Sequence, residues 1–172
     1  PSGAPVVAGG AGGGFARGKA LPGPGRWGVQ APQLTELAGW GANIRARCVL
    51  REAESERQVA AQVDRAGTIA RGLGRSYGDA ALNAGGRVLG MMRFDRYLSF
   101  DERTGTLRCE AGVSLDAIIR DFAPRGWFPM ITPGTKFVTV GGCVVNDIHG
   151  KAHHVQGTFC NCVDSLSILL AS

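Results

Sequence analysis

Residues 70–79 read Ala-Arg-Gly-Leu-Gly-Arg-Ser-Tyr-Gly-Asp and continue directly from the short apolar run 68–70. That run is typical of a buried strand, so the glycines begin where a strand ends. Glycine permits positive φ and lets the backbone come close to a ligand. Successive N–H groups in such a loop form a concave site for an anion. The stretch therefore predicts a strand followed by an anion cradle.

Two common nucleotide motifs do not describe this loop. It lacks the G-x-G-x-x-G spacing, and Asp79 follows at once rather than about 20 residues later, so it is not a Rossmann fingerprint. Neither glycine-rich loop of the chain ends in Gly-Lys-Ser/Thr, which excludes a P-loop. A pair of ordinary tight turns remains the alternative at this point.

A second glycine-rich stretch lies downstream. Residues 133–135 read Pro-Gly-Thr, a short strand-like segment follows, and residues 139–142 read Thr-Val-Gly-Gly. We expect this second loop to present backbone N–H groups in the same way as the first.

All three histidines of the chain fall within residues 149–154, which read His-Gly-Lys-Ala-His-His. His149 and His153 would share one face of a helix and could bind a metal, but Gly150 disfavours that helix. A polar loop with coincidental histidines is the second interpretation. The third is an active-site wall, in which imidazole and ammonium groups face a redox centre and an anionic or hydroxylated substrate.

The remaining pattern mixes strands and helices. Ser55 and Gln58 form a capping box before a helix with apolar residues at helical spacing. Ser114 begins a second helix, which Pro124 and Gly126 end. The expected strands span residues 68–70, 88–92, 97–101, 107–111 and 166–170.

Composition divides the chain of 172 residues into two parts. Ten of its 27 glycines lie in the first 30 residues, which are too poor in apolar side chains to offset their ordering entropy. We therefore expect a flexible Gly/Pro-rich tail over 1–33 and a folded domain over 34–172.

Charge and cysteine usage exclude several classes. The net charge is +5, but the arginines are scattered without a basic run, so no nucleic-acid partner is expected. Five cysteines without a CxxC pair argue against a disulfide framework and against a structural zinc site, and no metal is expected. Free thiols favour a cytoplasmic location, with a periplasmic or membrane-associated one as the alternative. Neither a membrane-spanning apolar run nor a signal peptide is visible.

Several ordered motifs resemble one family. Residues 70–79, 110–115, 133–142 and 147–154 resemble the flavin-binding segments of the vanillyl-alcohol-oxidase and para-cresol-methylhydroxylase (PCMH) family. The string Asp-Ile-His-Gly-Lys-x-His-His, together with Gly39-Trp40-Gly41, resembles the branch that contains the oxidase subunit of decaprenylphosphoryl-ribose 2-epimerase. The resemblance covers about residues 37–170 and implies an α+β, PCMH-type FAD-binding domain. Its two α/β lobes would grip FAD, the second lobe being incomplete and the separate substrate domain absent.

The resemblance also implies roles for individual residues. Tyr77, His149 and Lys151 would face the substrate as catalytic candidates, with Tyr77 packing on the flavin and Lys151 pairing a carboxylate as the structural alternatives. The expected FAD contacts are Ala70, Arg71, Gly72, Leu73, Gly74, Arg75, Ser76, Tyr77, Gly78, Asp79, Gly134, Thr139, Val140, Gly141, Gly142, Asn146, Asp147, Ile148 and His149.

The implied reaction is oxidation of a sugar or alcohol CH–OH group by hydride transfer to FAD. The implied substrate is a sugar or a polyprenyl-phosphate-sugar, and peripheral membrane association is compatible with it. Some relatives attach FAD covalently through a histidine of the first loop. That position is Arg75 here, and because a guanidinium does not alkylate the flavin, we expect non-covalent FAD. The alternatives are a sugar-lactone or alditol oxidase of the same fold and a non-catalytic nucleotide-binding remnant.

Three positions depart from the branch. Cys160 replaces a glycine and Cys162 replaces a histidine. The first change puts the backbone freedom at position 160 in doubt, and the second puts any polar role of the histidine in doubt. Asn146 stands where a small residue or cysteine is usual. If Cys160 and Cys162 lay on a strand, their side chains would point the same way.

Overall fold

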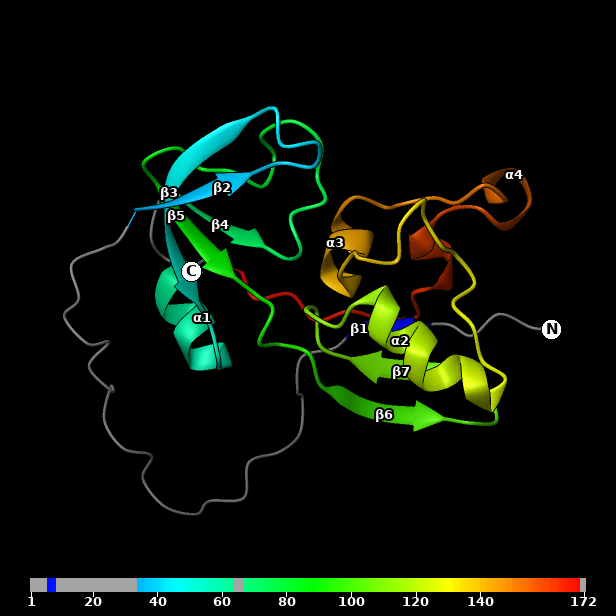
Figure 1. Cartoon of the computed structure of the whole chain (residues 1–172). Helices are drawn as coiled ribbons and strands as arrows, with labels where there is room; N and C mark the ends of the chain where they lie inside the picture. The colour runs from blue at the N-terminus through cyan, green and yellow to red at the C-terminus, as the bar shows by residue number, and fades with distance from the viewer. Residues whose placement is uncertain (1–5, 9–33, 64–66, 171–172) are drawn as a thin grey trace, which may run out of the picture.

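The chain forms two lobes, each built around its own sheet (Figure 1). The computed structural model describes residues 6–8, 34–63 and 67–170. Strands and helices occur together in both lobes, in agreement with the expected α+β class. Within the described residues, no helix is long and apolar enough to cross a membrane.

The first lobe holds a four-stranded sheet in the order β2-β3-β5-β4. Its elements are β2 (Leu34–Ala38), β3 (Arg45–Glu52), α1 (Glu56–Val63), β4 (Thr68–Arg71) and β5 (Arg87–Gly90). β2 runs antiparallel to β3, whereas β3, β4 and β5 are parallel. The carboxyl ends of these three parallel strands therefore share one edge of the sheet, where ligands of open α/β sheets usually bind.

Helix α1 begins after Ser55, as predicted, but the capping box is incomplete because the Gln58 side chain accepts from the N–H of Glu54 rather than that of Ser55. The Gln58 N–H group donates to Ser55 Oγ at 3.4 Å, and Gln58 Oε1 accepts from the Glu54 N–H at 2.6 Å. The helix is amphipathic rather than buried, since only its Val59 packs on a small core. That core consists of Ala53, Leu89 and Phe94, with Met91 alongside.

The second lobe holds a three-stranded sheet in the order β1-β7-β6. Its strands are β1 (Val6–Ala8), β6 (Tyr97–Asp101) and β7 (Thr106–Cys109), and α2 (Leu115–Phe122) lies against the sheet (Figure 1). Ser114 caps α2, because its Oγ accepts the Ala117 N–H at 3.1 Å. The 3-10 turn Ala123–Arg125 (η1) then closes the helix at Gly126, as expected from the sequence.

Helix α2 supplies one side of the main hydrophobic core. Leu115, Ile118 and Phe122 face the sheet, and short segments of the second half close the core from the other side. Those segments are α3 (Val140–Val145) and the 3-10 turn Phe159–Cys162 (η2). A short helix, α4 (His153–Gln156), lies between them in the chain and away from this core, at the molecular edge (Figure 1).

Two expectations differ from the structure. Val6–Ala8 form strand β1, which pairs in parallel with Leu107–Cys109 of β7. The predicted tail therefore needs correction at these three residues, and its remaining part, 1–5 and 9–33, lies outside the described residues.

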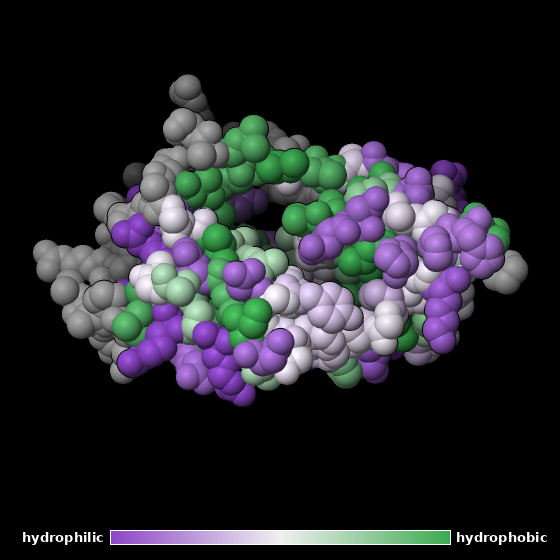
Figure 2. Space-filling view, turned by 90° about the horizontal axis from the view of Figure 1, so that it is seen from above, coloured by the Kyte–Doolittle hydropathy of each residue, from purple (hydrophilic) through white to green (hydrophobic). Residues whose placement is uncertain are grey.

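The predicted buried strand 166–170 is wrong. No strand spans these residues, and the exposed fraction is 69% for Ile168 and 75% for Leu170. Leu166 makes a single β-bridge, and the residues after it do not extend this bridge into a ladder. Seen from above, apolar residues surround a hollow near the centre of the molecule (Figure 2).

A buried carboxylate, that of Glu110, follows β7 and binds Arg96 in the segment that connects the two lobes. Glu110 is 8% exposed and receives two hydrogen bonds of 3.0 Å from Arg96, one from Nε and one from the backbone N–H. Burial raises the pKa of Glu110, but the hydrogen bonds from Arg96 outweigh burial and hold the pKa below its ordinary value of 4.5. The charged pair therefore stabilises the fold above that pH, and this contribution is lost as the pH falls through the folded-state pKa.

Glu110→Gln should lower the free energy of unfolding by about 1–2 kcal/mol at pH 7, because the Arg96 donors lose their charged acceptor. In urea titrations, the difference from the unaltered protein should shrink as the pH falls below 4.5. Glu102→Gln is the matched control, since the Glu102–Arg125 pair lies at the surface. A difference that persists unchanged in acid would contradict this account.

Candidate functional site

The first glycine-rich loop leaves the carboxyl end of β4, as the sequence predicts. Gly74 and Gly78 adopt positive φ values of +68° and +62°. Among the described residues, no backbone N–H group from Gly72 to Asp79 donates a hydrogen bond to the protein. The loop therefore presents a run of unused donors, as an anion cradle requires.

Arg71 supports this loop from below. Its Nη1 donates to the Ala81 carbonyl at 2.7 Å and its Nη2 to the Ala38 carbonyl at 2.8 Å. A Cβ at Gly74 would overlap the guanidinium, so only glycine fits there. Burial lowers the pKa of Arg71. The Arg71 side chain therefore holds the loop in place, and its expected contact with FAD stays a prediction.

The structure brings the two glycine-rich segments together. A Cβ added at Gly72 would overlap the Thr139 side chain, so the backbone of the first loop lies directly against that side chain. Thr139 is also the N-cap of α3, and its Oγ1 accepts the Gly142 N–H at 3.3 Å. One contact thus joins the first lobe to the start of a helix in the second lobe.

The second segment does not act as the expected loop of free donors. Residues 140–142 are the first turn of α3. The Val140 N–H donates to Val113 O and the Gly141 N–H to Ala111 O, both at 2.8 Å. Sequence reasoning treated Gly141-Gly142 as a second cradle, whereas Gly141 is needed because Ala111 packs against it.

Three further candidates lie after α3, and their polar groups are used within the fold. The Asn146 side chain donates to Gly142 O at 2.8 Å, and the Asp147 carboxylate accepts the Cys160 N–H at 2.9 Å. That hydrogen bond is the main cause of a lowered pKa at Asp147. Ile148 packs against the main core. These side chains shape the wall of the site rather than offering free ligand groups.

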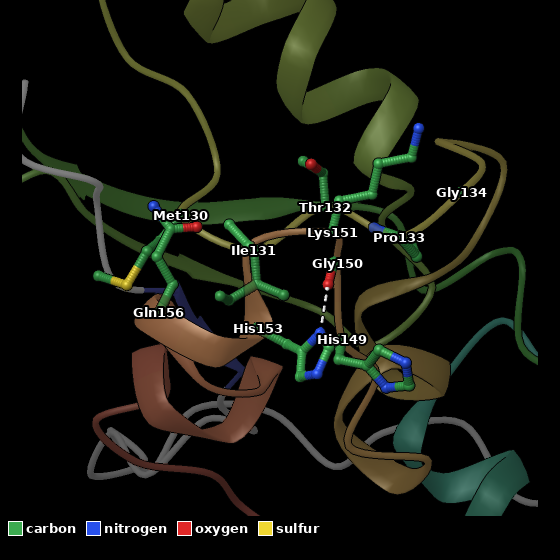
Figure 3. A pocket seen from close by; sticks show the side chains of 11 residues that line it. Met130, Ile131, Thr132, Pro133, Gly134, His149, Gly150, Lys151, His153 and Gln156 are labelled. Atoms are coloured by element: carbon green, nitrogen blue, oxygen red, sulfur yellow. Dashed lines mark hydrogen bonds between the residues drawn. The ribbon is translucent and has the colours of Figure 1, made fainter.

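The cluster around residues 149–154 borders a cavity of about 750 Å³ (Figure 3). One wall is residues 130–134 and the other is residues 149–153, with Gln156 from α4. The two walls touch, since a Cβ at Gly150 would overlap Thr132 O. Sequence reasoning missed residues 130–132, because Met130 and Ile131 are apolar and Thr132 belongs to no recognised motif.

The histidine and lysine side chains point different ways in this cavity. The His149 and His153 rings lie 5.2 Å apart between centroids, and His153 Nδ1 lies 3.2 Å from Gly150 O. Lys151 extends away from both rings (Figure 3). The metal interpretation required one helix through both histidines, but α4 begins only at His153. Among the described residues, no three His, Cys, Asp or Glu side chains converge on one point.

Tyr77 and Gly134 complete the predicted set. Tyr77 is 81% exposed and does not line the cavity, so the structure does not bring it together with His149 and Lys151. Gly134 lines the cavity with open space around its Cα. The remaining cofactor candidates, Ala70, Leu73, Arg75, Ser76 and Asp79, all belong to the first loop or the strand before it.

The two unusual cysteines lie on a turn rather than a strand. Cys160 is exposed and Cys162 is buried, so they do not point the same way. Thr158 and Asn161 form a capping box around them, and Cys160 does not adopt positive φ. Neither cysteine therefore disturbs the local backbone.

Comparison with known proteins agrees with this geometry. The family described as "FAD binding domain" matches residues 49–172. The chain belongs to this family. FAD is therefore the cofactor of the domain.

The FAD-binding domain is similar to parts of longer proteins. It is 42% identical over 147 residues to decaprenylphosphoryl-beta-D-ribose oxidase of Mycolicibacterium smegmatis, covering 85% of this chain and 30% of that protein. It is 27% identical over 93 residues to a D-lactate dehydrogenase of Anaerostipes hadrus, covering 54% of this chain and 20% of that protein. A solved alkyldihydroxyacetonephosphate synthase shares the fold, with a TM-score of 0.56 and 18% identity over 70% of this chain and 24% of the other.

The residues present fit FAD. Its pyrophosphate needs several N–H donors at close range, and the loop from Gly72 to Asp79 offers unused ones. Arg75 Nε is buried without a hydrogen-bond partner among the described residues, so the loop also contains an unused side-chain donor.

Gly72→Ala should lower the free energy of unfolding by about 1–3 kcal/mol, because the new methyl group must displace Thr139. The same variant should bind FAD more weakly, since the loop and α3 move apart. Gly134→Ala is the control for stability, because nothing lies within 4 Å of its added Cβ. Equal melting temperatures for the two variants would refute the close contact.

Proposed function

We propose that this chain is the FAD-binding part of an oxidoreductase that oxidises a CH–OH group of a sugar attached to a polyprenyl phosphate. The observation that carries the proposal is the loop of free N–H donors held against the start of α3. A cavity bordered by Lys151, His149 and His153 lies in the second lobe. The 42% identity to decaprenylphosphoryl-beta-D-ribose oxidase supports the substrate class. The chain spans 30% of that relative, so the activity is proposed for a whole protein that contains this domain.

The chain's own residues would divide the work. The first loop would hold the pyrophosphate through backbone N–H groups. FAD, when bound, supplies the hydride acceptor. His149 would border the reacting region, and the Lys151 ammonium would attract the anionic phosphate or a hydroxyl of the substrate.

A second candidate is oxidation of a smaller hydroxylated compound, which the similarity to a D-lactate dehydrogenase supports. The first candidate is preferred because its relative covers more of the chain at higher identity. Its substrate carries a lipid, so we also propose peripheral membrane association. The five cysteines, all free, support a cytoplasmic location.

FAD should be released from the protein by acid. Arg75 occupies the loop position at which a histidine would form a covalent link, and a guanidinium is not a nucleophile that would form this link. After trichloroacetic acid precipitation, we expect the flavin absorbance in the supernatant. Flavin retained in the washed pellet would contradict non-covalent binding.

Lys151→Ala should spare FAD binding but reduce substrate-dependent flavin bleaching at least about 100-fold, since a positioned charge contributes that much. The measurement is anaerobic stopped-flow absorbance in the whole protein with a polyprenyl-phosphate sugar. Lys136→Ala is the matched control, because the Lys136 ammonium already pairs with Asp116 at 2.6 Å. Unchanged bleaching in Lys151→Ala would remove this lysine from the mechanism.

A further inference from the structure

We propose that Trp40 is a positioning residue for FAD, acting through Arg75 of the first loop. The proposal rests on the FAD site described above and requires no particular substrate. It concerns the turn between β2 and β3, to which sequence reasoning gave no role beyond a family resemblance.

The turn has a defined shape that brings it to the loop. The Gly39 N–H donates to Ile44 O at 3.2 Å and the Ala42 N–H to Gly39 O at 3.0 Å. Gly41 and Ala42 both adopt positive φ, of +87° and +56°. A non-glycine residue in this region is uncommon, so the turn is held by its surroundings rather than by local preference.

Three contacts fix the turn on the loop. The Trp40 N–H donates to Ser76 O at 3.0 Å. A Cβ at Gly39 would overlap Gly78 O, so the two backbones are in close contact. The Arg75 Cζ lies 5.2 Å from the centroid of the Trp40 ring, within the range of a cation–π interaction.

These contacts leave several of the five N–H donors of Arg75 unused, and Nε is the buried one among them. Its Nη1 donates to the Leu73 carbonyl at 2.5 Å, while its Nε is buried and has no partner among the described residues. A buried donor without an acceptor is unfavourable, and an anionic oxygen of the cofactor would satisfy it. The Trp40 ring is therefore needed to keep the guanidinium in the orientation that the cofactor meets.

The turn also receives support from the strand before it. The Arg71 side chain donates to Ala38 O at the end of β2. The segment that leads into the turn is therefore also joined to the residue that precedes the first loop. Trp40 is 42% exposed, which means that its ring is not a core residue whose loss would unfold the lobe.

The test is the dissociation constant of FAD, measured by quenching of flavin fluorescence. Trp40→Leu should weaken FAD binding about tenfold, whereas Trp40→Phe, which keeps an aromatic face, should weaken it less than about threefold. Arg75→Gln should also weaken binding. In the Arg75→Gln background, Trp40→Leu should have little further effect, because the two residues act as a unit.

Phe137→Leu is the matched control. It removes an exposed ring that lies 5.3 Å from the Lys136 ammonium, outside the first loop, and should leave FAD affinity unchanged. Melting temperatures without FAD show whether Trp40→Leu still folds, and Trp40→Phe and Arg75→Gln test the idea if it does not.

The proposal would be overturned if Trp40→Leu weakened FAD binding equally in the unaltered and the Arg75→Gln protein. It would also be overturned if Trp40→Leu and Trp40→Phe weakened FAD binding equally. Failure of the unaltered protein to bind FAD would overturn the flavin site itself and this proposal with it. FAD binding that follows the expected pattern in a protein that oxidises no sugar would support the role of Trp40 and contradict only the proposed function.

Discussion

The contact between Gly72 and Thr139 is the constraint on which the site depends. It is the point where the first loop meets α3, and it allows no side chain beyond hydrogen at position 72. Because Thr139 also caps α3, the same residue sets the helix start and the loop position. The two sheets share no strand, so this approach fixes how the cradle faces the second lobe.

The loop keeps its donors free because it is held through its carbonyl groups. Met91 N–H donates to Arg71 O, Trp40 N–H to Ser76 O and Leu82 N–H to Asp79 O. Each of these bonds uses a carbonyl oxygen of the loop segment and leaves the N–H groups of the loop without an acceptor among the described residues. The segment around α3 is anchored in the opposite way, through the N–H groups of Val140 and Gly141. One glycine-rich stretch thus keeps its N–H donors free, and the other uses them to pack against its neighbours.

Sequence reasoning could predict the parts of this arrangement that local chemistry determines. The alternation and capping signals gave β6, α2 and the start of α1, and the glycine spacing gave the cradle. It could not assign Arg71, whose partners Ala38 and Ala81 lie in other elements, nor the engaged donors at the start of α3. The error over residues 166–170 has the same cause, because a strand depends on a neighbour and not on its own composition.

The two cysteine positions show how a motif tolerates change when its backbone is held by other residues. Asn161 accepts from the Thr158 N–H at 2.7 Å, and Asp147 accepts from the Cys160 N–H at 2.9 Å. The turn therefore stays in place whatever side chain stands between these bonds, provided that no positive φ is required. Cys162 fills a buried position as a small apolar group, and its Sγ donates to Phe159 O. Drift at these positions is thus compatible with an intact wall of the cavity, and it does not argue that the flavin site has been lost.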